Sequence, residues 1–197
     1  AGVVRAVARQ YPLRGASIGL LARGRAGLEG ALRDVEALGG QALVLQADVA
    51  DSAQVERCAT KLEEAFGPID IWINNAMASV YSAVKDTPAD EFKRVTDVTY
   101  LGVVHGTLAA LRRMLPRNRG VIVQVGSALA YRGIPLQAAY CAGKHAVQGF
   151  CDSLRAELLH DGELALGSPK VRRKHLGWHR VEVAERLVEV DGQPQVG

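Results

Sequence analysis

A tyrosine and a lysine four residues apart carry the clearest chemical signal in the sequence. Tyr140 and Lys144 lie in the stretch AAYCAGKHAV, residues 138–147, where most neighbours are small. On a helix, residues at this spacing share one face. A free tyrosine hydroxyl is a poor base at neutral pH, but an adjacent ammonium group favours its ionised form. The pair therefore predicts a group that passes a proton to or from a substrate oxygen, although the same spacing also occurs on ordinary surface helices.

A serine upstream of this pair is a candidate for binding the same substrate oxygen. Ser127 ends the apolar run GVIVQVGS, residues 120–127. Open α/β sheets place their active residues at the carboxyl ends of strands, so a strand here would bring Ser127 to the site. The Gly-x-Ser-x-Gly turn of serine hydrolases is absent around Ser127, which excludes a hydrolase of that type.

The segments that must position these residues alternate between short apolar runs and longer amphipathic ones. Two glycines close residues 24–40, and an Asp-Ser cap signal stands at residue 51. Thr87 is the expected N-cap of another helix, with Pro88 in its first turn. Apolar strands that alternate with helices are typical of a parallel sheet covered on both faces. We therefore expect strands at residues 17–23, 41–49, 69–76 and 120–127, and helices at 24–40, 51–67, about 87–115 with a break, and 137–160.

Composition and charge narrow the class of protein. The chain has 197 residues, of which 48% are apolar and 23% are charged, which is ordinary for one globular domain. No apolar run is long enough to cross a membrane, and the early charges of AGVVRAVARQ argue against a signal peptide. The net charge of +3 does not point to nucleic acid. Three cysteines without paired spacing, Cys58, Cys141 and Cys151, indicate reduced thiols and predict a cytoplasmic protein.

Two features near the end of the chain have weaker interpretations. His175 and His179 have the spacing of metal ligands on a helix, but no nearby carboxylate or thiolate completes a site, so we expect no metal. The basic run KVRRKH, residues 170–175, lacks the interleaved aromatic residues of a nucleic-acid surface and is more typical of a solvated face. We expect neither a nucleic-acid nor a membrane partner.

Three motifs together make the chain similar to the short-chain dehydrogenase/reductase family. They are NNA at residues 74–76, VGSALAY around Ser127, and YCAGK at residues 140–144. The resemblance extends from residue 1 to about residue 160 and includes the order of the expected strands and helices. It implies an α/β fold with a Rossmann-like, doubly wound parallel sheet in three α/β/α layers over residues 1–162. Residues 163–197 are an unassigned tail with mixed helix and strand signals.

The resemblance also implies a reaction. Family members interconvert a carbonyl and a secondary alcohol by hydride transfer with NAD or NADP, and the cofactor supplies the hydride. By resemblance, Tyr140 is the acid/base, Lys144 favours the phenolate and holds the nicotinamide ribose, and Ser127 orients the substrate carbonyl. The expected partners are a small carbonyl or alcohol substrate and further copies of the chain. The resemblance implies a homodimer or homotetramer formed through helices at 99–115 and 137–160.

The front of the expected cofactor site departs from the family pattern. The first strand and the first glycine of the family's Gly-rich turn are absent, Gly2 matches the middle glycine, and Val4 stands at the last. The absent strand lies at the centre of the family's sheet, so we expect a loss of ladder partners on both of its sides. This departure leaves a second hypothesis open: a catalytically inactive, family-derived fragment that acts as a binding or structural domain.

Other positions resemble cofactor contacts of the family. Arg23 stands where an acidic residue would bind the ribose 2′-hydroxyl. An arginine there, with Arg25 nearby, favours the 2′-phosphate of NADP, so NAD is the less favoured cofactor. Asp48 resembles the aspartate that contacts adenine, although it could equally cap the following helix. Asn74 and Ala76 of the NNA motif resemble residues that line the cofactor cleft, although an asparagine side chain also stabilises turns of this kind.

Two further departures concern residues beside the expected site. Met77 stands where a glycine usually follows NNA, so we expect a tighter backbone approach to the cofactor. Thr99 stands where many family members carry an asparagine that completes a proton relay through water. A threonine hydroxyl can hold a water, but it can also bond to its own helix backbone, and the sequence favours neither.

Overall fold

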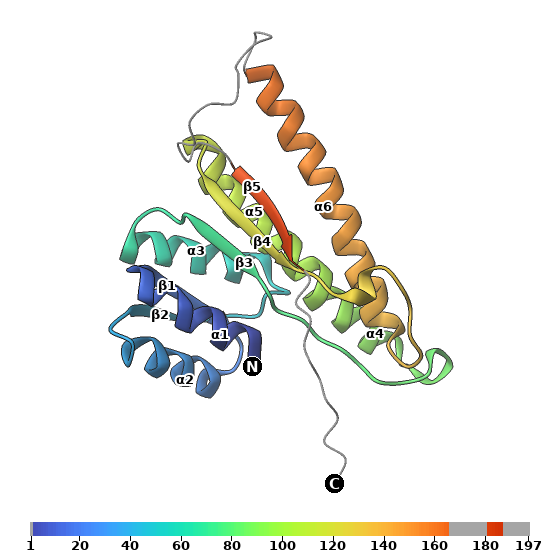
Figure 1. Ribbon diagram of the computed structural model, residues 1–197. Coiled ribbons are helices and arrows are strands. Elements are labelled where there is room, and N and C mark those ends of the chain that lie inside the picture. Colours follow the sequence, from blue (N-terminus) through green and yellow to red (C-terminus); the bar gives the residue numbers. More distant parts are fainter. Residues whose placement is uncertain (1, 166–180, 187–197) are drawn as a thin grey trace.

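Two small parallel sheets and the helices beside them make up the structure (Figure 1). The computed structural model describes residues 2–165 and 181–186. Its strands are β1 (Ser17–Ala22), β2 (Gln41–Gln46), β3 (Ile71–Asn74), β4 (Gly120–Val125) and β5 (Val181–Arg186). Its α-helices are α1 (Gly2–Gln10), α2 (Arg25–Glu36), α3 (Ser52–Phe66), α4 (Ala89–Thr96), α5 (Gly102–Met114) and α6 (Ala138–Ala165). The alternation of strands and helices expected from the sequence is confirmed.

The strand pairing contains the break that the sequence predicts. β1 pairs with β2 in parallel, and β3, β4 and β5 pair in parallel in that order. Within the described residues no pairing joins β1 to β3, so each of these strands keeps one unpaired edge. The expected loss of ladder partners is therefore confirmed. β5 and the end of α6 are the parts of residues 163–197 that the structure places.

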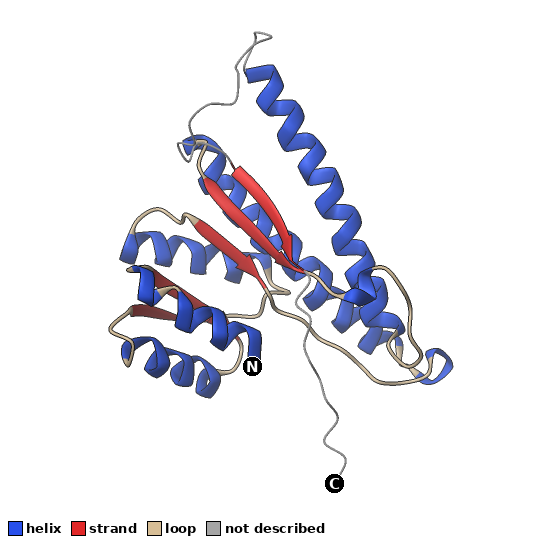
Figure 2. Ribbon diagram, viewed as in Figure 1, coloured by secondary structure: helices blue, strands red, loops and turns tan. Residues whose placement is uncertain are grey.

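The first sheet is covered on both faces, as Figure 2 also shows. Successive side chains of a strand point to opposite faces. Accordingly Ile18 and Leu20 of β1 pack with the buried residues of α1 and α2. Leu21 lies on the opposite face and packs with Cys58 and Leu62 of α3. This half of the molecule has the three layers expected from apolar strands between helices.

The second sheet is buried mainly on its α5 face. Residues of β4 alternate between buried and half-buried, and Ile122 and Gln124 are fully buried on the same face. Ile122 belongs to a core cluster with Val55 of α3 and Met114 of α5. On the opposite face the side chains are more open, and Ile71 of β3 is 41% exposed.

The break expected in the helical region around residues 87–115 is a π-helical segment. α4 leads into the π-helix Asp97–Leu101, which is followed directly by α5. Segments of this kind often lie at functional sites. The expected cap by Thr87 is wrong, because Pro88 occupies the N-cap position and no side chain caps the helix. The Thr87 hydroxyl instead donates to the carbonyl oxygen of Ala83 at 2.9 Å, inside the preceding turn.

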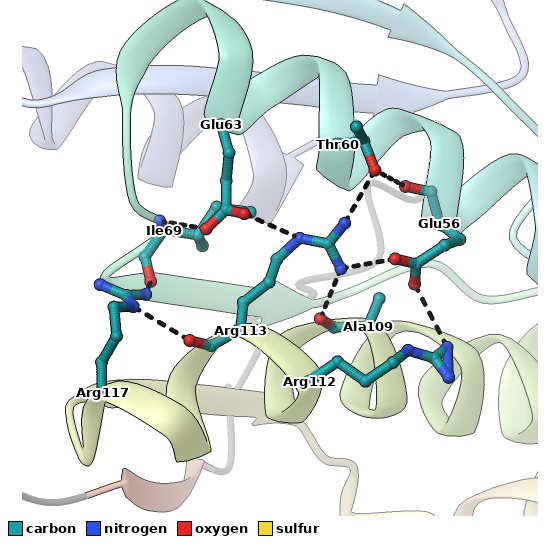
Figure 3. A network of polar contacts seen from close by, with 8 residues as sticks. All are labelled: Glu56, Thr60, Glu63, Ile69, Ala109, Arg112, Arg113 and Arg117. Carbon is teal, nitrogen blue, oxygen red and sulfur yellow. Dashed lines mark hydrogen bonds and ion pairs between the residues drawn. The ribbon is translucent and has the colours of Figure 1, made fainter.

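A buried arginine joins α3 to α5 (Figure 3). The Arg113 side chain is 10% exposed and pairs with Glu56 at 2.8 Å and Glu63 at 3.1 Å. It also donates to Thr60 Oγ1 and to the Ala109 carbonyl, each at 2.9 Å. Because α3 packs on the first sheet and α5 on the second, this network helps to hold the two sheets together.

Replacing Arg113 with methionine is expected to lower the free energy of unfolding by about 2–3 kcal/mol. Both glutamates would lose a charged partner while remaining partly buried. Arg112→Met is the matched control, because the Arg112 side chain is 59% exposed and, among the described residues, forms an ion pair only with Glu56. It should cost less than about 1 kcal/mol. Urea unfolding of both variants measures the difference, and equal losses would contradict a role for the buried network.

No helix in the described part of the chain is both long and apolar enough to span a bilayer. All three cysteines are buried, and none forms a disulfide. The described part of the chain contains no group of three or more His, Cys, Asp or Glu side chains that could hold a metal ion. His175, His179 and the run KVRRKH lie outside the described residues.

Candidate active site

The candidate active site lies where the parallel strands end. Arg23 directly follows β1, and Asp48 lies two residues after the end of β2. Asn74 is the last residue of β3, and Ser127 lies two residues after β4. Carboxyl ends of parallel strands form one edge of a sheet, which is where α/β proteins bind ligands.

Contacts from α4 and α5 join the end of β2 to the second sheet. An ion pair of 2.8 Å connects Arg94 of α4 to the Asp48 carboxylate. His105 of α5 lies 2.9 Å from the Val49 carbonyl oxygen through its Nδ1 atom. Because a carbonyl only accepts, this nitrogen must carry the proton. A side chain at Gly102 would come within 2.7 Å of Val49, so the glycine permits this close approach.

Asp48 is a stable anion beside the expected cofactor region. Burial alone would raise the pKa of the Asp48 carboxyl, but the hydrogen bond from the Ala50 amide and the Arg94 guanidinium hold this pKa below its ordinary value. Arg23 adds a further favourable charge. The alternative role of Asp48 as a helix cap is wrong, because Asp51 caps α3 by accepting from the Gln54 amide at 3.0 Å.

The first turns of α6 bring Tyr140 and Lys144 to the end of β4. The Lys144 ammonium lies 5.8 Å from the centre of the Tyr140 ring, as the four-residue spacing predicts. Lys144 is 4% exposed, and its Nζ donates to the carbonyl oxygen of Val125 at 2.7 Å. Val125 is the last residue of β4 and lies two residues before Ser127. A buried charge is therefore held between the tyrosine and the serine strand.

Ser127 begins a short 3₁₀-helix, Ala128–Ala130, that packs against α6. Its Oγ accepts a hydrogen bond from the Leu129 amide at 3.2 Å. This bond orients the side chain and leaves the hydroxyl proton for another acceptor. The arrangement suits a group that donates to a substrate oxygen.

Thr99 lies in the π-helical segment and connects it to the loop after β3. Its Oγ1 accepts from the Ala78 amide at 3.0 Å and donates to the Ala78 carbonyl at 2.9 Å. Of the two expectations from the sequence, bonding to its own helix backbone is therefore wrong. A side chain at Gly143 of α6 would lie 3.2 Å from Thr99 Cγ2. The glycine in YCAGK thus allows α6 to pack closely on this segment.

Asn74 belongs to a buried polar network that sequence reasoning missed. Its Nδ2 donates to Gln124 Oε1 at 2.9 Å and to Thr107 Oγ1 at 3.2 Å, and its Oδ1 accepts from the Trp72 indole at 2.8 Å. Gln124 in turn donates to Thr107 at 2.8 Å, and both are fully buried. Gln124 could have indicated this network from the sequence, because a polar residue inside an apolar strand needs buried hydrogen-bond partners.

The comparison with known protein families identifies the chain. Residues 1–164 match the family model described as short chain dehydrogenase. The chain belongs to this family. Membership confirms the resemblance drawn from NNA, Ser127 and YCAGK, and it places the chain in a family of oxidoreductases.

Several relatives of this short-chain dehydrogenase family member cover most of its length. It is 33% identical to Dehydrogenase/reductase SDR family member 7B of Rattus norvegicus over 198 residues, which are 97% of this chain and 59% of that protein. It is 32% identical to the uncharacterized oxidoreductase YxnA of Bacillus subtilis (strain 168) over 158 residues, which are 80% of this chain and 44% of that protein. The chain thus spans about three fifths or less of the length of these relatives.

Solved structures share the fold. NAD⁺-bound xylitol dehydrogenase matches with a TM-score of 0.75 and 30% identity, over 78% of this chain and 59% of that one. A metagenomic short-chain oxidoreductase in complex with NADP matches with a TM-score of 0.80 and 24% identity, over 94% of this chain and 76% of that one. These matches confirm the Rossmann-like α/β class.

The other expected cofactor positions of this family member differ in their exposure and in whether they form ion pairs. Arg23 is exposed, and its guanidinium makes no ion pair within the described residues. Arg25 is exposed but pairs with Glu29 at 2.8 Å. Gly2 is the first residue of α1, and Ala76 is exposed in the loop after β3. Arg23 is therefore the cation that is available for an anionic ligand at these strand ends.

Proposed function

We propose that this chain carries out NAD(P)-dependent interconversion of a carbonyl and a secondary alcohol, with Tyr140 as the acid/base. The observation that carries the proposal is the placement of Lys144. Its ammonium is buried, bonded to the end of β4 and close to the Tyr140 ring. A packing role would not require a buried charge beside a phenol at a strand end, where burial of a cation is costly.

Each residue of the site has a role that follows from its contacts. When bound, the nicotinamide cofactor supplies or accepts the hydride. Tyr140 gives its hydroxyl proton to the carbonyl oxygen during reduction and takes it back during oxidation. Lys144, whose Nζ donates to the Val125 carbonyl oxygen, would hold its ammonium beside the phenol during this exchange. The Ser127 hydroxyl would donate a hydrogen bond to the same substrate oxygen and so orient it, without transferring its proton.

The residues of the cofactor region fit a dinucleotide with a 2′-phosphate. The unpaired Arg23 guanidinium supports NADP over NAD, because charge-assisted bonds to phosphate are strong. Lys144 would hold the nicotinamide ribose, and Asp48 would contact the adenine. Gly2 and Ala76 would allow the backbone to approach the cofactor closely.

Replacing Arg23 with aspartate is expected to weaken NADPH binding about 10–100-fold, because a charge-assisted phosphate contact is lost and a like charge is introduced. NADH has no 2′-phosphate, so its dissociation constant should stay within about threefold or fall. Titrations monitored by nicotinamide fluorescence measure both values. The matched control is Arg25→Asp, and an equal loss of NADPH affinity there would contradict the specific role of Arg23.

Dinucleotide binding also separates this proposal from a second one. The unjoined β1 and β3 edges favour a catalytically inactive domain that only binds or supports partners. At about 100-fold over its dissociation constant, a bound dinucleotide should stabilise the fold by about 2.7 kcal/mol, which a thermal shift detects. Binding of NADPH followed by turnover of small aldehydes or ketones would support the enzyme. If neither NADPH nor NADH binds, the enzyme proposal for this chain fails.

The proposed assembly is a homodimer or homotetramer formed through α5 and α6. Exposed leucines on these helices support it: Leu108 is 44% exposed, Leu115 immediately after α5 is 49%, and Leu159 is 54%. Light scattering that finds only monomer would contradict this assembly. Buried cysteines that form no disulfide support a cytoplasmic location, where cysteines stay reduced.

A further inference from the structure

A groove between β2 and α3 lies outside the candidate active site. It has a volume of about 600 Å³ and is lined by residues 43–46 of β2 and by one stripe of α3. The stripe includes Arg57, Cys58 and Lys61, which are spaced to share one helix side. None of Ser127, Tyr140 and Lys144 lines it.

The strand side of this groove is an edge and not a face. Successive residues of a strand point to opposite faces, so four consecutive lining residues can meet one groove only along the strand edge. Among the described strands, β2 pairs only with β1, and its other edge is open. The sequence of β2, QALVLQ, contains neither a charge nor a proline. It therefore lacks the usual features that protect an open edge from pairing with another chain.

The helix side of the groove is positively charged. Arg57 and Lys61 are exposed, and neither makes an ion pair within residues 2–165 and 181–186. Glu64 is the single acidic residue in the lining. Burial raises the pKa of the Cys58 thiol, so this side chain is a neutral part of the wall at neutral pH. A second copy of the chain would bring the same two cations, which disfavours self-pairing at this edge.

The spacing of the two cations matches that of an added strand. Arg57 and Lys61 are four residues apart on α3, which is about 6 Å along a helix. Side chains two residues apart on a strand share a face and are about 6.6 Å apart. Acidic residues at alternate positions of an extended segment would therefore meet both cations.

We propose that this groove binds an extended acidic segment of a partner protein, which adds a strand to the open edge of β2. Backbone hydrogen bonds to β2 would contribute affinity, as in other cases of strand addition. Carboxylates at alternate positions would pair with Arg57 and Lys61 and select acidic sequences. The site is separate from the proposed catalytic function and does not depend on it.

Fluorescence polarisation with the full chain tests the proposal. The probe is a fluorescein-labelled peptide of three Glu-Val repeats, compared with three Lys-Val repeats and with a fully N-methylated Glu-Val peptide. The Glu-Val peptide should bind, and each comparison peptide should bind at least tenfold more weakly. Amides of residues 41–46 should exchange with deuterium more slowly when the peptide is bound. A Glu-Val peptide that does not bind, or an N-methylated one that binds equally, would overturn strand addition.

Charge reversal locates the binding. Arg57→Glu combined with Lys61→Glu should weaken peptide binding at least tenfold, whereas Arg14→Glu combined with Arg33→Glu should leave it within twofold. If the first double variant does not fold, Arg57→Gln combined with Lys61→Gln replaces it. Unchanged binding in the groove variant would overturn the site. Binding of phosphatidylserine vesicles through Arg57 and Lys61, without peptide binding, would assign the surface to a membrane and overturn the peptide proposal.

Discussion

Replacing Tyr140 with phenylalanine is expected to lower the turnover of a carbonyl substrate by about 10³-fold. The change removes only the hydroxyl, and with it the proton that the reacting oxygen must gain or lose. Lys144 keeps its bond to the Val125 carbonyl, because that contact does not involve the phenol. NADPH binding should therefore stay within about threefold of the unmodified chain. Steady-state kinetics at saturating NADPH and a fluorescence titration measure the two effects separately.

A second tyrosine controls for the loss of a hydroxyl in general. Tyr11 is half-buried and lies just after α1, away from the strand ends. Tyr11→Phe should leave turnover within about twofold of the original. If Tyr140→Phe retains most of its turnover, the phenol is not the proton donor, and another group must be sought. If Tyr140→Phe loses both turnover and NADPH binding, the residue has a structural role that the proposal does not include.

Replacing Gly106 with alanine is expected to lower the free energy of unfolding by about 3–5 kcal/mol. A methyl group at this position would overlap Asn74 Oδ1 and lie 2.6 Å from the Trp72 indole nitrogen. Both atoms are joined by a hydrogen bond of 2.8 Å, so the added carbon must displace the bond or the helix. If the Asn74 side chain shifts, its hydrogen bonds to the buried Gln124 and Thr107 side chains would also be lost. Urea unfolding measures the loss.

Gly149 is the matched control for this substitution. It is also a helical glycine, but it is exposed on α6, and a side chain there would meet nothing within 4 Å. Alanine is the better helix former, so Gly149→Ala should stabilise the protein by up to about 1 kcal/mol. Equal effects at Gly106 and Gly149 would mean that helix propensity decides the outcome and that the polar network is loose.

Tyr140 and Gly106 lie on two helices, α6 and α5, that are connected through the π-helical segment. Tyr140 is the residue proposed to act at the reacting oxygen, and Gly106 allows α5 to approach the end of β3, where Asn74 lies. Loss of the close packing at Gly106 should also disturb the position of Tyr140, because α5 continues from the π-helical segment that packs against α6. A partly folded Gly106→Ala variant is therefore expected to lose NADPH binding together with stability.

The sequence alone determined the kind and order of the elements. Apolar runs between amphipathic segments depend on residues close together in the chain, so β1 to β4 and the main helices were predicted within a few residues. The spacing of Tyr140 and Lys144 and the serine at a strand end also follow from local sequence, and they identified the family. The missing pairing between β1 and β3 was predicted in the same way, and among the described strands these two lie in separate sheets.

Only the tertiary structure decided which polar groups meet. Asn74 and Gln124 are fifty residues apart, and Asp48 pairs with Arg94 from a separate helix. The sequence predicted the cap of α3 by Asp51, which is confirmed, but the possible caps by Thr87 and Asp48 are wrong, because these side chains bond to Ala83 and Ala50 instead. A side chain that has several acceptors within reach takes the one that packing brings to hydrogen-bond distance. That distance depends on how whole helices and sheets lie against one another, which local sequence patterns do not specify.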